Sequence, residues 1–99
     1  MLELAATVAL QHHERYDGSG YPFGLAGEEI APEARIVALC DVYDALRARR
    51  SYKPGFDHDT ACRIILRGDG RTRPEHFDPA ILSAFVRAED RVIRLYGLA

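Results

Sequence analysis

The sequence predicts an all-α fold of about four helices, and three observations support this class. Apolar residues recur at the 3.6-residue helical period in several segments. Residues that cap helices stand where two of these segments begin. No segment shows the strict apolar–polar alternation of a strand, and no internal repeat appears. With 99 residues, 47% hydrophobic and 28% charged, the chain has the size of one small globular domain or part of one.

The first helix is expected over residues 2–15, where neither Gly nor Pro interrupts the pattern. No cap residue precedes it, so the chain resembles a domain entered part-way along a helix. Leu2, Ala5, Ala6, Ala9, Leu10 and His13 follow the helical period in this segment. Residues 16–32 then hold four glycines and two prolines, and this density of helix breakers predicts an ordered loop with special backbone angles.

The second helix is expected over residues 33–49, opened by Pro32. Between residues 36 and 46 only Asp41 and Asp44 are charged, and the other nine residues are apolar, so the helix is expected to be buried on all sides. A buried carboxylate must be neutralised, paired with a cation or bound to a metal. For Asp41 both a salt bridge to a buried Arg and a metal ligand remain open, whereas Asp44 is interpreted as a structural residue that forms hydrogen bonds or pairs with Arg.

Two further helices follow. Asp57 can cap the third, which ends at Gly68, and Asp78 with Pro79 opens the fourth, which continues to Gly97 after the polar residues 69–76. The inner face of the third helix is expected to carry Ala61, Ile64 and Ile65, and that of the fourth Ile81, Leu82, Phe85, Ala88, Val92 and Tyr96. The cysteines, Cys40 and Cys62, are interpreted as small buried hydrophobic residues.

Charge and hydropathy exclude several function classes. Thirteen basic and fifteen acidic residues give a net charge of −2, which argues against binding to bulk nucleic acid or to a membrane surface. The apolar runs are far shorter than the roughly 20 residues of a membrane-spanning helix, and the pattern of a signal peptide is missing. A cytoplasmic protein is therefore expected.

His12 and His13 are the first candidates for chemistry. Successive helical side chains point about 100° apart, so two adjacent imidazoles suit two neighbouring metal ions better than one. A surface pair that caps helix carbonyls is the alternative for these histidines. Imidazole and carboxylate ligands suit divalent Fe, Mn, Zn or Co, and the same ions would satisfy a buried Asp41.

A basic segment at the end of the second helix is a candidate phosphate site. Arg50 and Lys53 lie just before Pro54, where the chain must leave helical geometry. Arg offers a planar fork to phosphate oxygens and Lys a point charge. The alternative is a solvated helix end, since Arg47 and Arg49 precede them and cations are favourable there.

Three ordered motifs resemble the HD-GYP domain family. Residues 12–22, HHERYDGSGYP, are similar to its two His and a Glu followed by Asp-Gly-x-Gly-Tyr-Pro. Residues 36–54, IVALCDVYDALRARRSYKP, resemble its Asp-x-Tyr/Phe-Asp-Ala-Leu helix and the segment that follows, although Ser51 stands where Pro is usual. Residues 77–85, FDPAILSAF, resemble its closing Phe-Asp-Pro helix.

The resemblance implies a helical metal-dependent phosphohydrolase that hydrolyses cyclic di-GMP or a related phosphodiester, with divalent Fe, Mn or Zn ions. His12, His13 and Asp41 correspond to metal ligands, and Arg50 and Lys53 to residues that hold the substrate phosphate. Tyr21 would line the substrate site, within a motif loop that includes Asp17, Gly18, Gly20 and Pro22. In the family this loop also bears on contacts with GGDEF-type proteins. A metal-activated water would be the nucleophile, and no side chain is assigned as a catalytic group.

The His-Asp pair that family members carry upstream of these motifs is missing from this chain, and His58-Asp59 is interpreted as the start of a helix instead. Residues 1–99 are therefore expected to be the C-terminal part of one HD-GYP domain, a partial helical bundle without its N-terminal helices. Such a chain should be weakly active or inactive alone and hold sub-stoichiometric metal. Uncovered apolar faces would favour a homo-oligomer or the missing half as partner. The alternatives are a non-catalytic module that binds nucleotide or a GGDEF-type partner, and an unrelated helical metal protein.

Overall fold

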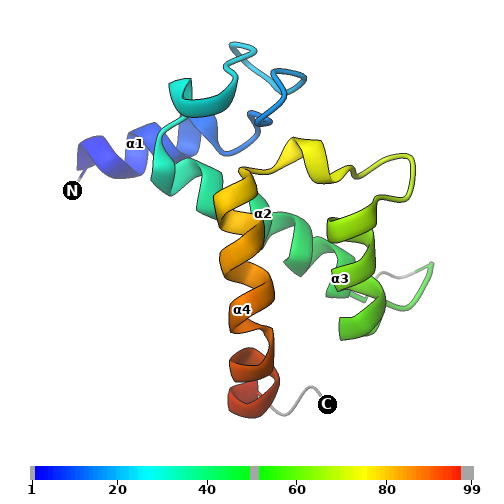
Figure 1. Cartoon of the computed structure of the whole chain (residues 1–99). Helices are drawn as coiled ribbons and strands as arrows, with labels where there is room; N and C mark the ends of the chain where they lie inside the picture. Colours follow the sequence, from blue (N-terminus) through cyan, green and yellow to red (C-terminus); the bar gives the residue numbers. More distant parts are fainter. Residues whose placement is uncertain (1, 50–51, 97–99) are drawn as a thin grey trace.

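The computed structural model describes residues 2–49 and 52–96, with the backbone alone at residue 90 and residues 92–96. These residues form four α-helices and no strand, so the all-α prediction is confirmed for them (Figure 1). The helices are α1 (Leu2–Gln11), α2 (Pro32–Arg47), α3 (His58–Arg67) and α4 (Pro79–Tyr96). Two short 3₁₀ turns, Gly27–Glu29 and Pro74–His76, lie in the connections that precede α2 and α4.

Helix α2 occupies the centre of the fold. Helices α1 and α3 both pack against it, and α4 runs beside it in Figure 1. The core consists of Leu39, Ile65 and Phe77, one residue each from α2, α3 and the segment before α4. Around it pack the half-buried residues Val42, Tyr43, Leu46, Ile81, Leu82 and Phe85. Of the inner-face residues predicted for α4, Val92 and Tyr96 lie outside the described side chains.

The predicted caps of α3 and α4 are confirmed. An Asp57 carboxylate oxygen accepts a hydrogen bond from the Thr60 amide at 2.8 Å, and Gly68 ends α3 with φ +88°. Asp78 accepts from the Ala80 amide at 2.8 Å, directly before the first turn of α4. These side chains satisfy amides that a helix leaves without partners at its N-terminus, so the sequence located both starts correctly.

Helix α1 ends four residues earlier than predicted, at Gln11. His12 and His13 lie in the turn that follows, closed by a hydrogen bond from the Glu14 amide to the Gln11 carbonyl at 2.9 Å. Helix α1 buries no residue, and its Leu2 and Leu10 are 87% and 54% exposed. The physical reason is that, in the described structure, only α2 covers this helix substantially.

Helix α2 is not buried on all sides, contrary to the prediction. Of its residues only Ala34 and Leu39 are buried, whereas Ile36 is 50% exposed and Cys40 and Asp41 are exposed as well. The described helices cover only part of its circumference, so Ile36 and Cys40 face outward. The interpretation of Cys40 as buried is therefore wrong, and that of Cys62, 4% exposed, is confirmed.

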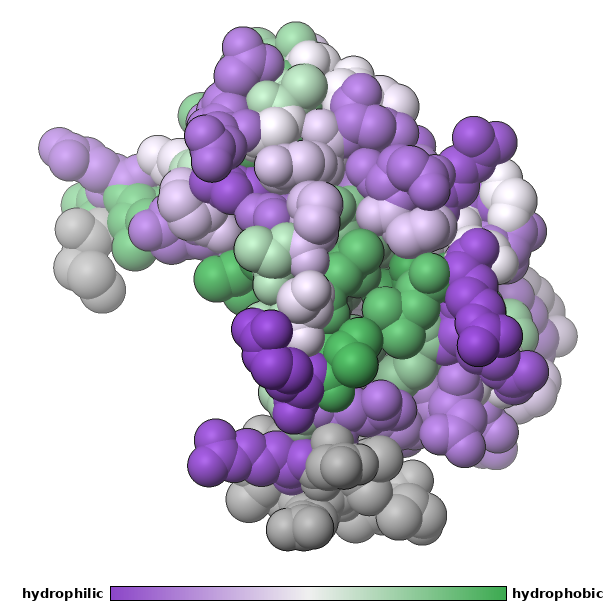
Figure 2. All heavy atoms as spheres, viewed as in Figure 1, coloured by the Kyte–Doolittle hydropathy of each residue, from purple (hydrophilic) through white to green (hydrophobic). Residues whose placement is uncertain are grey.

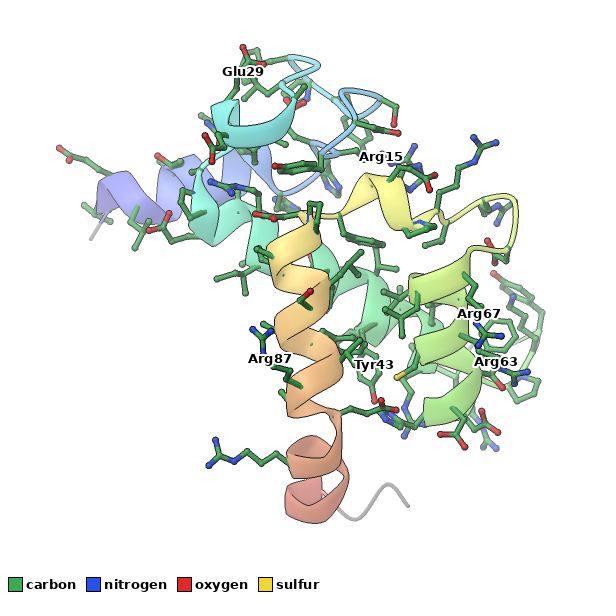
Figure 3. All side chains as sticks on the ribbon, viewed as in Figure 1. Arg15, Glu29, Tyr43, Arg63, Arg67 and Arg87 are labelled. Carbon is green, nitrogen blue, oxygen red and sulfur yellow. The ribbon has the colours of Figure 1, made fainter. Side chains whose placement is uncertain are left out.

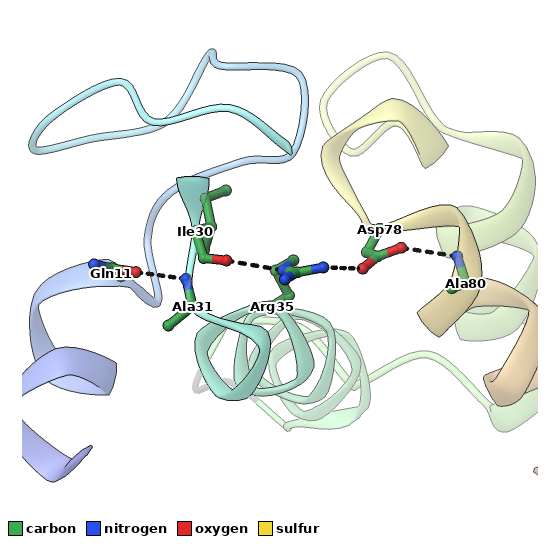
Figure 4. Close-up of polar contacts among 6 residues, drawn as sticks. All are labelled: Gln11, Ile30, Ala31, Arg35, Asp78 and Ala80. Carbon is green, nitrogen blue, oxygen red and sulfur yellow. Dashed lines mark hydrogen bonds and ion pairs between the residues drawn. The ribbon is translucent and has the colours of Figure 1, made fainter. Parts of the chain in front are cut away.

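A chain of polar contacts joins three helices near the start of α2 (Figure 4). The Gln11 side chain of α1 accepts from the Ala31 amide at 2.8 Å. The Arg35 guanidinium donates to the Ile30 carbonyl at 2.9 Å and to the Asp78 carboxylate at 2.6 Å. Because the Arg35 and Asp78 side chains are only 14% and 9% exposed, this ion pair fixes α2 against the start of α4.

An apolar groove lies on the surface between α3 and α4. Figure 2 shows hydrophobic residues gathered on this face, and the groove is lined by Leu66, Leu82 and Val86 with Ser83 and Arg87. None of the described helices is both long and apolar enough to cross a membrane.

Candidate functional site

A pocket of about 340 Å³ lies where the end of α1, the middle of α2 and the segment before α4 meet. Arg15, labelled in Figure 3, lies at this place between the glycine-rich loop and that segment. The lining residues are His12, His13, Glu14, Arg15, Tyr21, Ala38, Asp41, Val42, Ala45, Thr72, His76 and Phe77. The structure therefore gathers His12, His13, Asp41 and Tyr21, all predicted as site residues, around one cavity.

His12 presents one ring nitrogen to Asp41. Its Nδ1 lies 3.0 Å from the Val8 carbonyl oxygen and 3.1 Å from that of Ala9. Carbonyl oxygens only accept, so Nδ1 carries the proton and the lone pair of the neutral ring lies on Nε2. That Nε2 is 3.9 Å from Oδ2 of Asp41. The main chain of α1 thus orients His12 in the way that metal-ligating histidines are usually oriented, by a hydrogen bond to the other ring nitrogen.

His13 lies between His12 and Tyr21. The two imidazole centroids are 4.0 Å apart, and the His13 ring stacks on the Tyr21 ring at 4.9 Å with an interplanar angle of 17°. The Tyr21 amide also donates to the His13 carbonyl at 3.3 Å. Tyr21 therefore holds His13 from the loop side, while its own ring remains 61% exposed at the mouth of the pocket.

Asp41 is an accessible carboxylate rather than a buried one, with 55% of its side chain exposed. In the described structure its ionic neighbour is His12, and the buried arginine of α2, Arg35, pairs with Asp78 instead. Among the described residues, no arginine forms a salt bridge with Asp41. Asp44 is exposed, and its side chain makes no hydrogen bond or ion pair within the described residues. The interpretation of Asp44 as a residue that forms hydrogen bonds or pairs with Arg is therefore wrong for this part of the chain.

The motif loop depends on a turn and a close approach. Asp17 accepts from the Ser19 amide at 3.0 Å and from the Ser19 hydroxyl at 2.6 Å. Slight burial raises the pKa of Asp17, but these hydrogen bonds outweigh it and lower the pKa below 3.8. A Cβ at Gly20 would lie 2.5 Å from the His13 carbonyl oxygen, so only glycine lets the loop rest on this backbone. Gly18 has φ +87°, and the peptide before Pro22 is cis.

Glu14 is a functional residue for which the sequence interpretation gave no role. It is 2% exposed, and its two carboxylate oxygens accept from the Phe23 amide at 2.7 Å and the Leu25 amide at 2.8 Å. Glu14 therefore fixes the loop rather than facing the pocket as a free ligand. The position of Glu14 between a helix and a glycine-rich loop could have indicated this role, because the amides of a loop need hydrogen-bond acceptors.

His76 also lines the pocket, and no sequence pattern indicated it. It comes from the 3₁₀ turn before α4 and accepts a hydrogen bond from the Arg73 amide at 3.3 Å. Burial lowers the pKa of His76, and the positive charge of Arg15 lowers it further. At neutral pH its imidazole is therefore a neutral, polar part of the pocket wall.

Of the two residues of the predicted phosphate clamp, the structure describes Lys53. Lys53 is exposed, its ammonium lies 5.4 Å from the centroid of the Phe56 ring, and it is not among the lining residues. Arg50 lies outside the described residues. The role of both residues in holding a phosphate stays a prediction.

The donors at the pocket fit a divalent transition metal. Two donor atoms each about 2.1 Å from one ion can be at most about 4.2 Å apart. The 3.9 Å between His12 Nε2 and Asp41 Oδ2 lies within that limit. Imidazole with carboxylate is a ligand set suited to Fe, Mn and Zn. The residues of the pocket thus fit the divalent metal ions that the sequence predicts.

Comparisons with known proteins show the family of this chain. A family model for the HD domain matches residues 1–81. The chain is 48% identical over 94 residues, 95% of its length, to a cyclic di-GMP phosphodiesterase of Vibrio cholerae. It is 45% identical over 96 residues, 97% of its length, to the cyclic di-GMP phosphodiesterase response regulator RpfG of Xanthomonas campestris. A 3′3′-cGAMP-specific phosphodiesterase of Vibrio cholerae is 36% identical over 95 residues, 96% of the chain.

The chain spans only about a fifth to a quarter of these relatives, 18%, 24% and 17% of their respective lengths. Within that span it carries both histidines, the GYP tripeptide of residues 20–22 and the aspartate of α2, and His12, His13, Tyr21 and Asp41 line one pocket. The chain therefore belongs to the HD domain family, as a member of its HD-GYP group.

Proposed function

We propose that this chain is the C-terminal part of an HD-GYP phosphodiesterase domain that hydrolyses cyclic di-GMP, and that it supplies one side of the metal and substrate site. The observation that carries the proposal is the convergence of His12 and Asp41 from two helices, with 3.9 Å between Nε2 and Oδ2. The names of the relatives support a cyclic dinucleotide as substrate class.

His12, His13 and Asp41 would hold divalent ions, which supply Lewis-acid activation of the phosphodiester and of water when bound. The chain's own residues orient this site. The carbonyls of α1 fix the His12 ring, Tyr21 fixes the His13 ring by stacking, and Glu14 keeps the motif loop in place. Three ligands leave a two-metal centre incomplete, because each ion takes about four to six donors. We therefore expect weak or no hydrolysis by the 99-residue chain alone.

Metal content tests the ligand assignment. We expect protein purified without chelator to hold sub-stoichiometric Fe, Mn or Zn at this site, and His13→Ala and Asp41→Ala each to lower that content at least about threefold. Asp44→Ala is the matched control, since Asp44 is an exposed carboxylate of the same helix and does not line the pocket. Elemental analysis of the purified variants is the measurement, and all of them carry Cys62→Ser so that the buried thiol of α3 holds no metal. Unchanged metal in both ligand variants would refute the assignment.

Complementation tests the incomplete domain. We expect no measurable hydrolysis of cyclic di-GMP by the chain alone, and hydrolysis after mixing with the purified N-terminal half of a related domain. Chromatographic detection of the linear dinucleotide or GMP is the measurement. Full activity of the chain alone would contradict the incomplete site, and inactivity in every mixture would favour the non-catalytic alternative.

The phosphate role of Arg50 and Lys53 needs its own test. We expect Arg50→Ala and Lys53→Ala each to weaken cyclic di-GMP binding about tenfold, because each removes one positive charge that would contact the phosphate. Metal content should not change. Arg49→Ala serves as a neighbouring exposed control. Calorimetry in the complemented mixture measures the affinity for cyclic di-GMP. Equal affinities of the parent and both variants would contradict a role of these residues in phosphate binding.

A non-catalytic binding module is the second candidate. It is favoured by the exposed aromatic side chains of the motif loop, Tyr21 at 61% and Phe23 at 63%. Aromatic residues with much exposed area are typical of interaction sites. In this case the loop would contact a GGDEF-type protein or bind nucleotide without turnover. This candidate would be supported if the complemented mixture hydrolyses no cyclic di-GMP but binds the nucleotide or a GGDEF-type protein, and if Phe23→Ala abolishes that binding.

A further inference from the structure

A second group of metal-ligand side chains lies away from the pocket, between α3 and α4. His58 and Cys62 are four residues apart on α3, so they share one face of the helix, and Glu89 of α4 approaches them. One donor atom from each lies within 4.8 Å of the other two. His58 and Cys62 are 3% and 4% exposed, whereas the Glu89 side chain is 31% exposed, so the cluster is open from one side.

The distances between the donors match a small metal site. His58 Nε2 is 3.4 Å from Oε1 of Glu89 and 3.5 Å from Sγ of Cys62. In a tetrahedral zinc site with ordinary bond lengths, the N–O and N–S edges are about 3.4 and about 3.6 Å. The two distances from His58 Nε2 therefore already match those around a bound ion, and the Cys62 sulfur and the Glu89 carboxylate lie within 4.8 Å of one another.

Tyr43 of α2 completes this geometry. Its hydroxyl oxygen is 2.8 Å from Nδ1 of His58, and it lies beside α3 in Figure 3. When Nδ1–H donates to that oxygen, the Nε2 lone pair faces Cys62 and Glu89. Metal-ligating histidines are commonly held by such a contact at the other ring nitrogen. The imidazole nitrogen, the sulfur and the carboxylate then face one point, and a cation at that point would take the place of the thiol proton.

We propose that His58, Cys62 and Glu89 bind a divalent transition metal of the zinc class, with Tyr43 as a positioning residue for His58. Three protein ligands of the types His, Cys and Glu suit Zn²⁺ and leave a fourth position to solvent. Burial, with a contribution from Glu89, raises the pKa of Cys62 to about 11, so the metal-free thiol is protonated at neutral pH. This site is separate from the His12–Asp41 pocket and ties α3 to α4.

Cobalt substitution tests the site without relying on activity. Protein stripped with chelator is titrated with Co²⁺ under reducing conditions, and near-ultraviolet absorption reports thiolate–cobalt bonds. The histidine and aspartate ligands of the first pocket cannot give this signal, so the two sites are distinguishable. We expect the absorption in the parent and in Cys40→Ser, whose cysteine is exposed, and its loss in Cys62→Ser.

Two further variants sharpen the test. Glu89→Gln should weaken Co²⁺ binding at least about tenfold, and Tyr43→Phe about tenfold, because loss of an orienting partner typically costs 10–100-fold in metal affinity. Tyr52→Phe, which alters an exposed tyrosine, should change nothing. Circular dichroism of each variant checks that its helices are retained. Absence of the thiolate signal in the parent, or its persistence in Cys62→Ser, would overturn the proposal.

Discussion

Position 20 has no room for a methyl group. An added Cβ would lie 2.5 Å from the Arg15 amide nitrogen and 2.6 Å from the Glu14 Cα, and backbone atoms cannot move aside as a flexible side chain can. We expect Gly20→Ala to lower the free energy of unfolding by about 3 kcal/mol, at the upper end of overpacking costs. Urea denaturation measures this.

Gly27→Ala is the comparison for that prediction. Gly27 has φ +57°, but nothing lies within 4 Å of its added Cβ, so this variant meets the conformational penalty without a clash. We expect a loss of about 1 kcal/mol for it. Equal losses for the two variants would show that the motif loop does not rest tightly on residues 13–15.

Asp57 gives a pH-dependent prediction. Hydrogen bonds from Thr60 lower the pKa of Asp57 below 3.8, its ordinary value. Because the folded pKa is depressed, the stabilisation is fully present above pH 3.8 and is lost as the pH falls through the folded pKa. Asp57→Ala should therefore be less stable than the parent at neutral pH, with a smaller difference at about pH 3. Thermal melts at both pH values measure this, with Asp59→Ala, an exposed neighbour, as control.

At the scale of the elements, the Arg35–Asp78 pair decides how α2 meets α4. Asp78→Asn keeps an oxygen that can cap the Ala80 amide but leaves the guanidinium without its counter-charge in a mostly buried place. We expect a loss of about 3 kcal/mol in the free energy of unfolding, because removing one partner of a buried pair leaves the other charge uncompensated.

The double variant Arg35→Met with Asp78→Asn isolates that charge effect. It should recover a substantial part of the lost stability, since an apolar side chain of similar length can fill the same space. Glu3→Gln, which removes an exposed acid from α1, should have little effect. A double variant no more stable than Asp78→Asn in denaturant titrations would indicate that the pair acts mainly through packing.

For the whole molecule, stability should be distributed unevenly. Helix α1 buries no residue, whereas α3 buries five. A ten-residue helix is marginal without tertiary packing, so α1 should open locally far more often than α3. We expect α1 amides to exchange with solvent deuterium at least about tenfold faster than α3 amides. Hydrogen-exchange mass spectrometry measures this, and equal protection of both helices would contradict the expectation.

The sequence by itself determined the helical class, the caps at Asp57 and Asp78, and the residues that carry the HD-GYP resemblance. These features depend on local chemistry, because caps, breakers and motif order act within a few residues of the chain. The sequence also pointed to His12, His13 and Asp41 as one site. The distance between them required the structure, because it depends on how α1 crosses α2.

Only the tertiary structure decided which apolar surfaces are covered. The apolar sequence of α2 predicts a helix that is buried on all sides, yet only two of its residues are buried. Burial depends on how many other elements pack against the helix, and the periodicity of the sequence does not give that number. For the same reason the sequence misjudged Cys40, and it gave no role to Glu14, to His76 or to the cluster of His58, Cys62 and Glu89. Their partners lie on other segments, and long-range packing alone brings those together.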